Sequence, residues 1–311
     1  MSPVRLDPGP GTVADAYSSA HTPVLAVDPG DTLVVRSLDA SGHVEAQTTP
    51  GEVRPTLITE SRGHCLTGPV EVRGAEPGQM VALHLRSLRP DDWGWTVAGG
   101  RETPVTRRLG LTDVPPAWLL WAIDADAGTA TESRGFVVPT APFLGVMGVE
   151  PAEPGEHSTI PPRAGTGGNI DCRELVAGST LYLPVQVPGA LLYLGDGHAA
   201  QGDGEVGGTA VECGMTTELT VDVVDDRPLA TVHAETPAGR ITFGFDADLN
   251  AATGDALDAM VTWVQQLVGV DRGTALALAS ATVDLRVTQV ANQTWGVHAL
   301  LPWTALEPAR T

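Results

Sequence analysis

The chain has 311 residues, of which 42% are hydrophobic, and a mean hydropathy of +0.03; this excludes a disordered or membrane-spanning protein and leaves room for one large domain or two ordinary ones. Its 38 acidic residues outnumber 18 basic ones, all arginine, for a net charge of −20. Because binding phosphate needs clustered cations, this charge excludes nucleic acid and anionic membranes as partners, and the lack of lysine excludes Schiff-base chemistry.

Alternating apolar and polar residues, separated by Pro-Gly and Gly-Asp turns, predict a series of short β-strands. The predicted strands are 32–38, 70–73, 80–88, 181–187, 219–224 and 241–245. Residues 255–270 instead place apolar side chains at helical spacing, closed by Gly269, and Asp271 can cap a second helix through Ala281. We therefore expect an α+β fold: a β-rich core of mixed sheets, packed as a sandwich or barrel, with a late helical pair.

The proline- and glycine-rich region 150–168 is the longest predicted connection, and its length suggests a functional loop. It separates an N-terminal β-rich portion, residues 1–150, from a C-terminal α+β portion, residues 151–311. The two portions can equally form one integrated domain.

The cysteines Cys65, Cys172 and Cys213 are too few and too widely spaced for a disulfide framework or a thiolate zinc site. The N-terminal segment has no basic stretch followed by an apolar one, as a secretion signal would have. These features predict a protein of the reducing cytoplasm.

The densest group of unusual residues is GDGHAAQGDGEVGG at 195–208. Because a predicted strand at 190–194 precedes it, Asp196 and His198 can point to the same side and pair a carboxylate with an imidazole. Its six glycines allow positive φ angles and close approach of the backbone to a bound group. A glycine-rich hairpin turn, in which Asp203 and Gly204 only reverse the chain, would explain the same residues. We favour the functional interpretation.

Two weaker motifs accompany this segment. Asp171 follows a Gly-Gly pair, where aspartate commonly caps or turns the backbone, and His64 stands at the start of a predicted strand. The adjacent Cys172 has no histidine nearby in sequence and suits a small buried thiol better than a nucleophile. Since GxSxG, HExxH and a strand-linked GxGxxG are absent from the sequence, carboxylate and imidazole chemistry around a metal remains.

The stretch GDGHAAQGDGEVGGTAVE, residues 195–212, resembles the signature segment of the acetamidase/formamidase family. Further matches, in the order of the family, are TGPVEVRGAEPG (67–78), DWGWT (92–96), PFLGVMGVEPA (142–152), GGNIDCREL (167–175) and DLRVTQVANQTWGVHALLP (284–302). The resemblance implies a cytoplasmic amidohydrolase that cleaves acetamide or formamide to ammonia and a carboxylate. It also implies a β-rich homo-oligomer, such as a dimer, and a divalent metal, zinc or calcium.

Hydrolysis of an amide needs an activated water, stabilisation of the oxyanion and a proton for the leaving nitrogen. Under this resemblance we assign Asp171, Asp196 and His198 as metal ligands and Glu205 as the general base. Mixed oxygen and nitrogen ligands favour zinc over calcium.

Three further residues are candidates for substrate binding or a second, harder metal site: His64, Asp203 and Glu212. The competing hypothesis is a non-catalytic β-rich module that binds a metal or a small ligand, with the acidic glycine loop acting as a calcium-stabilised turn.

Overall fold

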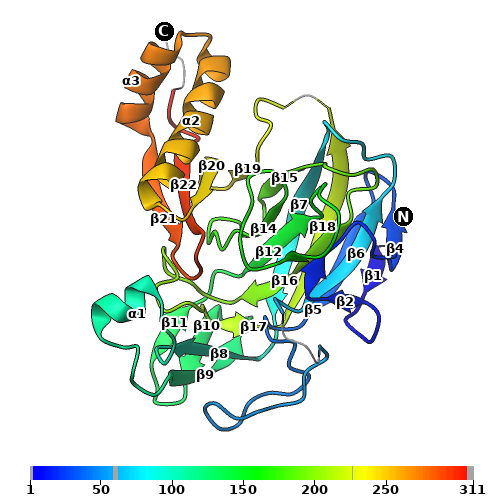
Figure 1. The fold of residues 1–311 in the computed structure, drawn as a ribbon, viewed down its shortest axis with the longest axis vertical. Coiled ribbons are helices and arrows are strands. Elements are labelled where there is room, and N and C mark those ends of the chain that lie inside the picture. Colours follow the sequence, from blue (N-terminus) through cyan, green and yellow to red (C-terminus); the bar gives the residue numbers. More distant parts are fainter. Residues whose placement is uncertain (1–2, 59–61, 226, 307–311) are drawn as a thin grey trace.

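The computed structural model describes residues 3–58, 62–225 and 227–306, and two large β-sheets dominate it (Figure 1). The first sheet has nine strands, in the order β1 (Val4–Leu6), β5 (Thr32–Ser37), β18 (Met215–Val224), β7 (Met80–Pro90), β15 (Thr180–Pro184), β19 (His233–Thr236), β20 (Gly239–Asp246), β22 (Trp295–Pro302) and β21 (Asp284–Gln289).

The second sheet has eleven strands, eight of which follow one path: β11 (Val137–Pro139), β10 (Thr129–Glu132), β9 (Ala117–Asp124), β8 (Trp93–Ala98), β17 (Glu212–Cys213), β16 (Leu192–His198), β12 (Phe143–Val149) and β14 (Gly167–Asn169). The strand β6 (Leu66–Val72) pairs with β16, and β2 (Val13–Ala14) and β4 (Leu25–Val27) pair with β6. A small third sheet joins β13 (His157–Ser158) to β3 (Ala16–Tyr17).

One hydrophobic core joins the two large sheets. It contains Leu83 and Leu181 from the first sheet and Leu144 and Leu192 from the second, all at 1% exposure or less. Both sheets are mixed, since β1 runs parallel to β5 and β4 runs parallel to β6, whereas the neighbouring pairs are antiparallel. The predicted β-rich core of mixed sheets is confirmed, and each of the seven strands predicted with bounds, the one at 190–194 included, overlaps an observed one.

The late helical pair is also confirmed, as α2 (Leu249–Val268) and α3 (Arg272–Thr282). The helix α2 begins six residues before the predicted start, because the Asp248 side chain accepts a hydrogen bond from the amide of Asn250 and caps the helix there. Gly269 ends it with φ at 71°, and Asp271 caps α3, as predicted. The pair packs on β20 and β22 at one end of the first sheet (Figure 1).

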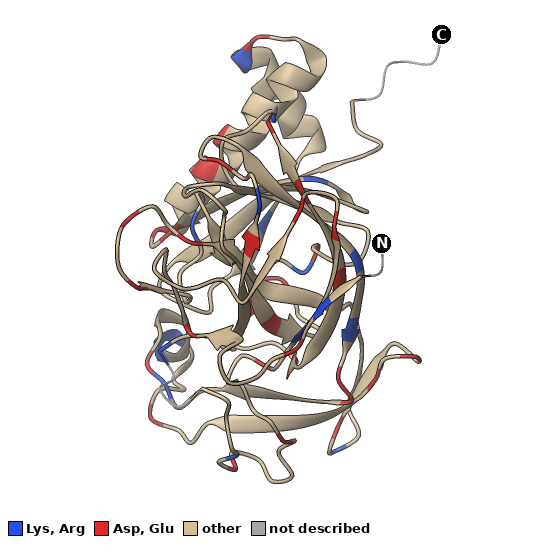
Figure 2. Ribbon diagram, turned by 90° about the vertical axis from the view of Figure 1, so that its right-hand side faces the viewer, with Lys and Arg blue, Asp and Glu red and all other residues tan. Residues whose placement is uncertain are grey.

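The predicted boundary at residue 150 does not separate the sheets. The first sheet combines β1, β5 and β7 with strands that follow residue 150, and the second pairs β12 with β16. Acidic residues are spread over strands and loops of the whole molecule (Figure 2). Within the described ranges, no helix is both long and apolar enough to cross a membrane.

The carboxyl group of Glu150, next to the end of β12, is buried at 1% exposure. Neither of its oxygens has a hydrogen-bond partner in the described part of the chain. Burial raises its pKa from 4.5 to about 8, so between these values the folded chain holds a proton that the unfolded chain has lost. Stability therefore falls as the pH rises through this interval, by at most roughly 1.4 kcal/mol per pH unit.

We expect Glu150→Gln to weaken this pH dependence, because the amide cannot ionise. Urea titrations at pH 5 and pH 8 should show a smaller loss of unfolding free energy in the variant than in the wild type. The matched control is Glu71→Gln, at a half-buried position of β6, which should keep the wild-type difference. Equal differences in Glu150→Gln and wild type would contradict the burial argument.

Candidate functional site

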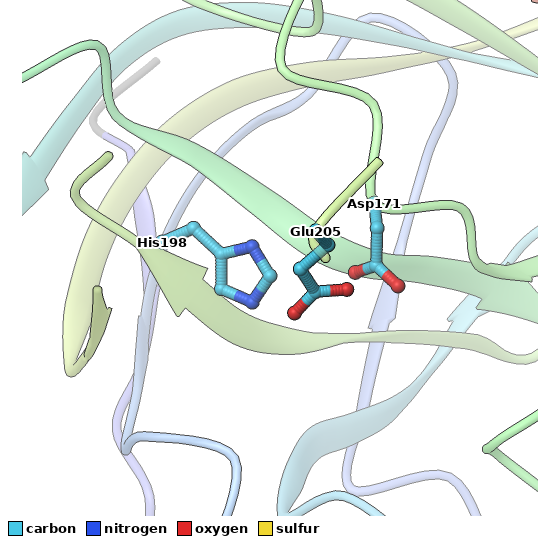
Figure 3. A group of neighbouring side chains, drawn as sticks. All are labelled: Asp171, His198 and Glu205. Carbon is cyan, nitrogen blue, oxygen red and sulfur yellow. The ribbon is translucent and has the colours of Figure 1, made fainter. Parts of the chain in front are cut away.

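Acidic and imidazole side chains from separate segments meet inside the protein. The ligand atoms of Asp171, His198 and Glu205 all lie within 4.8 Å of one another, and the same holds for Asp196, His198 and Glu212. All five residues are buried, at 6% exposure or less. Figure 3 shows the Glu205 carboxylate between the imidazole of His198 and the carboxylate of Asp171. The structure thus brings together residues that the sequence places more than 40 positions apart.

A glycine makes room for this cluster. Strand β12 pairs with β16 on both sides of Gly145, which lies opposite Asp196 in the register. A Cβ atom on Gly145 would lie 2.6 Å from Oδ1 of Asp171 and closer still to Oδ2 of Asp196. A side chain at this position would therefore push both carboxylates away.

We expect Gly145→Ala to weaken binding of a divalent cation at the cluster by roughly 5–150-fold, since overpacking of this kind costs about 1–3 kcal/mol. Titration with Zn²⁺ followed by calorimetry measures this directly. The control is Gly254→Ala in α2, where a Cβ meets no atom within 4 Å. Wild-type affinity in Gly145→Ala would show that the carboxylates are not confined by β12.

Backbone strain is concentrated at the cluster. Asp171, Asp196 and Glu205 have φ angles of 51°, 59° and 42°, in the left-handed region that residues with a side chain seldom adopt. Each such conformation costs on the order of 1 kcal/mol and persists only where the surroundings impose it. The left-handed backbone of Asp196 interrupts the regular alternation of side chains along β16. The side chains of Asp196 and His198 nevertheless both face the cluster.

The imidazole of His198 is held in one orientation by Gln201. The side-chain nitrogen of Gln201 donates to the backbone oxygen of Asp171 at 2.7 Å, so its oxygen faces Nδ1 of His198 at 2.9 Å. That oxygen can only accept, so Nδ1 carries a proton and Nε2 faces the carboxylates. Sequence reasoning missed Gln201 as a site residue, although it lies three positions after His198 within the signature segment.

Burial and the neighbouring charges shift the pKa of every ionisable group in the cluster. Burial raises the pKa of Glu205 to about 8 and that of Glu212 to about 7, and burial together with the charge of Glu205 raises the pKa of Asp171 well above its ordinary value. Asp196 differs: although burial opposes its charge, His198 and His64 hold its pKa below the usual range. For His198, Glu212 and Asp196 outweigh burial and raise the pKa.

The donor set fits a divalent cation. Both oxygens of Asp171 and one oxygen each of Glu205 and Glu212 have no hydrogen-bond partner among the described residues. Nε2 of His198 lies 3.4 Å from Oε1 of Glu212 and 3.5 Å from Oδ1 of Asp196. Neighbouring ligands on a tetrahedral ion, with bonds of ~2.0–2.2 Å, are separated by about 3.3–3.6 Å. These residues can therefore hold a divalent metal ion.

A cavity of about 880 Å³ opens above the cluster. Its inner wall includes the carboxylates of the cluster together with His64 and Asn169. His64 receives support from Thr159, whose hydroxyl lies 2.8 Å from the backbone nitrogen and 3.0 Å from Nδ1 of the ring. Ser158, Ile160 and Pro161 of the long predicted connection also line the cavity. Sequence reasoning did not single out Asn169, since an asparagine after two glycines commonly serves a turn.

Asp203 lies apart from the cluster. It belongs to a separate group with Glu174 and His298, and its Oδ2 lies 3.9 Å from Arg286, which also pairs with Glu174 at 2.6 Å. The structure thus does not bring Asp203 and Glu212 into one second site. The backbone of Gly204 pairs with the end of β21, and the chain turns at this residue. Asp203 and Glu205 therefore lie on different sides of the turn, and only Glu205 belongs to the cluster.

The three cysteines are free and buried, Cys172 at 0% exposure. Burial raises the pKa of the Cys172 thiol far above its ordinary value, which disfavours the thiolate that a nucleophile needs. If the chain has the amide-hydrolysing activity that the resemblance implies, we expect Cys172→Ala to keep the rate of acetamide hydrolysis within about tenfold of the wild type. Rapid inactivation by a thiol-alkylating reagent that substrate prevents and Cys172→Ala abolishes would contradict this expectation and indicate an acyl-enzyme.

A sequence profile of the Acetamidase/Formamidase family matches residues 16–154 and 152–238. The chain belongs to this family. The resemblance expected from the sequence is therefore confirmed, and the site lies within the matched part, between Asp171 and Glu212.

Relatives of known name and one solved structure are similar to this chain. The chain is 26% identical over 256 residues to a formamidase of Methylophilus methylotrophus and 28% identical over 256 residues to an acetamidase of Mycolicibacterium smegmatis, covering 66% and 64% of this chain. It spans 62% of the length of each of these relatives. The crystal structure of an acetamidase from Bacillus halodurans superposes with a TM-score of 0.85 and 28% identity, covering 96% of this chain and 97% of that one.

Proposed function

We propose that this protein hydrolyses short linear amides, such as acetamide or formamide, to ammonia and a carboxylate. The observation that carries the proposal is the buried group of four carboxylates around one oriented imidazole, at the bottom of a cavity and in a chain of this family. Burying so many acidic groups is costly unless they are paired or hold a cation, which points to a functional site rather than to packing.

Asp196, His198 and Glu212 would hold a divalent cation. Glu212 here replaces Asp171 of the sequence-based ligand set, because it shares one group with both Asp196 and His198 and its Oε1 lies 3.4 Å from Nε2 of His198, whereas Asp171 forms the other group, with His198 and Glu205. Mixed oxygen and nitrogen donors favour zinc over calcium. When bound, such a cation polarises the amide carbonyl and lowers the pKa of water to roughly 7.

Glu205 acts as the general base. Its carboxylate takes a proton from the attacking water and returns it to the leaving nitrogen, so that ammonia departs. A pKa raised to about 8 by burial lies close to neutral pH, which suits a group that must both accept and release a proton. Asp171 faces Glu205. Burial and the charge of Glu205 raise the pKa of Asp171, because two neighbouring buried carboxylates resist ionising together.

Two residues of the inner wall would orient the amide. Burial lowers the pKa of His64 and keeps the ring neutral, and with Nδ1 against the Thr159 hydroxyl its Nε2–H can donate to the developing oxyanion. The side-chain oxygen of Asn169 is buried and has no hydrogen-bond partner in the described segments, so it can accept from the NH₂ group of the substrate.

The cysteines and the exposed apolar side chains bear on the cellular location and the oligomeric state of the enzyme. Three buried free cysteines suit the reducing cytoplasm. Large apolar side chains such as Leu109, Phe136 and Val137 are 64%, 65% and 59% exposed, which supports a homo-oligomer, with a dimer as the simplest form. Light scattering on the purified protein measures its mass in solution.

The test is ammonia release from acetamide and formamide by the zinc-loaded protein, before and after treatment with a chelator. We expect turnover that disappears with the cation and returns when zinc is restored. A folded, cation-binding protein that leaves all short amides intact would instead support the non-catalytic binding module.

A further inference from the structure

The cavity is much larger than acetamide requires. Its volume of about 880 Å³ falls in the range of roughly 300–1,000 Å³ that holds drug-sized ligands, whereas acetamide would occupy only the part next to the carboxylates. Beyond the residues already named, much of the wall comes from two segments that face each other at the mouth, residues 101–107 around the start of α1 (Pro104–Leu109) and residues 291–294 in the turn between β21 and β22. Figure 1 shows this turn extending toward α1.

The mouth carries a cationic side chain that has no acidic partner among the described residues. Two arginines line it, and Arg107 is neutralised by Glu102, whose Oε1 lies 3.1 Å from Nε and 2.5 Å from Nη2. Arg101 makes only a long contact of 3.5 Å with the backbone oxygen of Ala291, and no carboxylate of the described residues pairs with it. Its guanidinium is therefore available to a ligand.

Arg101 also lies next to the turn that carries the proposed base. A Cβ atom on Gly208 would come within 3.1 Å of Nη2 of Arg101, so the guanidinium lies directly against this glycine. The amide of Gly208 in turn donates to the backbone oxygen of Glu205 at 2.9 Å. One molecule in the cavity can therefore reach both the carboxylate cluster and Arg101.

We propose that the preferred substrate is an amide with a carboxylate at its opposite end, and that Arg101 binds this carboxylate. The proposal rests on the proposed amide hydrolysis and names its substrate class. The amide has to lie beside Glu205 and the bound cation to react, and Arg101 is the cationic side chain of the wall that no carboxylate of the described residues pairs with; a guanidinium forms paired, charge-assisted hydrogen bonds with a carboxylate. The molecule therefore enters with its amide first and its carboxylate at the mouth.

The bonds that form and break in this substrate class are the same as in acetamide. Water adds its oxygen to the amide carbon, the carbon–nitrogen bond breaks, and the nitrogen leaves as ammonia with the proton that Glu205 took from the water. The second hydrogen of the water leaves the new carboxylic acid as a proton that ammonia takes up, so the products are ammonium and a dicarboxylate, whose new charge forms beside the acidic cluster. Repulsion there favours its release.

The test compares succinamate with 4-methylpentanamide, a neutral amide of similar shape, in wild type and Arg101→Gln. We expect the wild type to prefer succinamate, and Arg101→Gln to lower kcat/KM for succinamate by roughly 10–100-fold, mainly through KM, because the charge-assisted hydrogen bonds to its carboxylate are lost. Turnover of acetamide should stay within about twofold. Arg108→Gln, an exposed arginine of α1 outside the cavity wall, is the matched control and should leave all three substrates unchanged.

A wild-type preference for the neutral amide, or equal losses on both substrates in Arg101→Gln, would overturn the role of Arg101 while leaving amide hydrolysis intact. If no amide is hydrolysed, the proposed function fails. The role of Arg101 is then tested separately, by measuring the affinity of the protein for succinamate. Calorimetry of the zinc-loaded protein should then show that succinamate binds the wild type more tightly than Arg101→Gln. Equal affinities would reject the site.

Discussion

Glu205→Gln should lower kcat for acetamide by roughly 10²–10⁴-fold while the protein keeps its fold and its bound cation. The amide has the shape of the carboxylate but cannot accept a proton from water. It also removes the repulsion between Glu205 and Asp171 that raises the pKa of the latter, so the variant should fold at least as well as the wild type. Steady-state ammonia release and metal analysis of the same sample measure the two effects.

The matched control is Glu218→Gln, at a half-buried position of β18 outside the cluster, which should keep wild-type turnover. Near-wild-type turnover in Glu205→Gln would transfer the role of the base to another carboxylate. Glu212 would be the next candidate, since burial raises its pKa to about 7. Loss of the cation in Glu205→Gln would instead make Glu205 a ligand.

The fold was largely predictable because local patterns decide it. Alternation of apolar residues with turn glycines and prolines located strands such as β7 and β18, and an apolar stripe closed by Gly269 located α2. Local patterns do not determine the order of the strands in a sheet. In the first sheet, β18 lies between β5 and β7, although more than 120 residues of the chain separate it from each of them. Long-range pairing of this kind depends on packing across the core, so local patterns predict the strands but not which of them become neighbours in a sheet.

The cluster was predictable where glycines mark it. Asp171, Asp196, His198 and Glu205 all lie in glycine-rich segments, and three of them need left-handed backbone. Gln201 and Gly145 were not predictable as parts of the site, because their roles depend on which atom faces them across the sheet.

The grouping of ligands was beyond the sequence for the same reason. Spacing places Asp196 and His198 on one side of a strand but does not fix which further carboxylate approaches Nε2 of the imidazole. Glu212 does so because β17 pairs with β16, where Glu212 lies directly opposite His198. Asp203 is close in sequence to Glu205 but lies on the other side of a turn.

His198→Gln should abolish binding of the divalent cation and with it the activity. His198 belongs to both groups of potential ligands, so no set in the cluster keeps its nitrogen donor without it. The loss of cation affinity should exceed the ~10–100-fold that follows when a residue merely orienting a ligand is changed. Activity should fall at least ~10³-fold, because stabilisation of the oxyanion alone contributes about 10²–10³-fold and the activation of water is lost as well.

Thermal unfolding provides a readout that does not depend on activity. A cation that binds only the folded protein raises its Tm, so zinc should stabilise the wild type and leave the Tm of His198→Gln unchanged. His84→Gln is the matched control, since His84 is a half-buried histidine of β7 held by Thr180, and it should keep both the shift and the turnover. If His198→Gln kept the zinc-induced shift but lost activity, His198 would be a catalytic acid or base rather than a ligand, because the four carboxylates would then suffice to bind the ion.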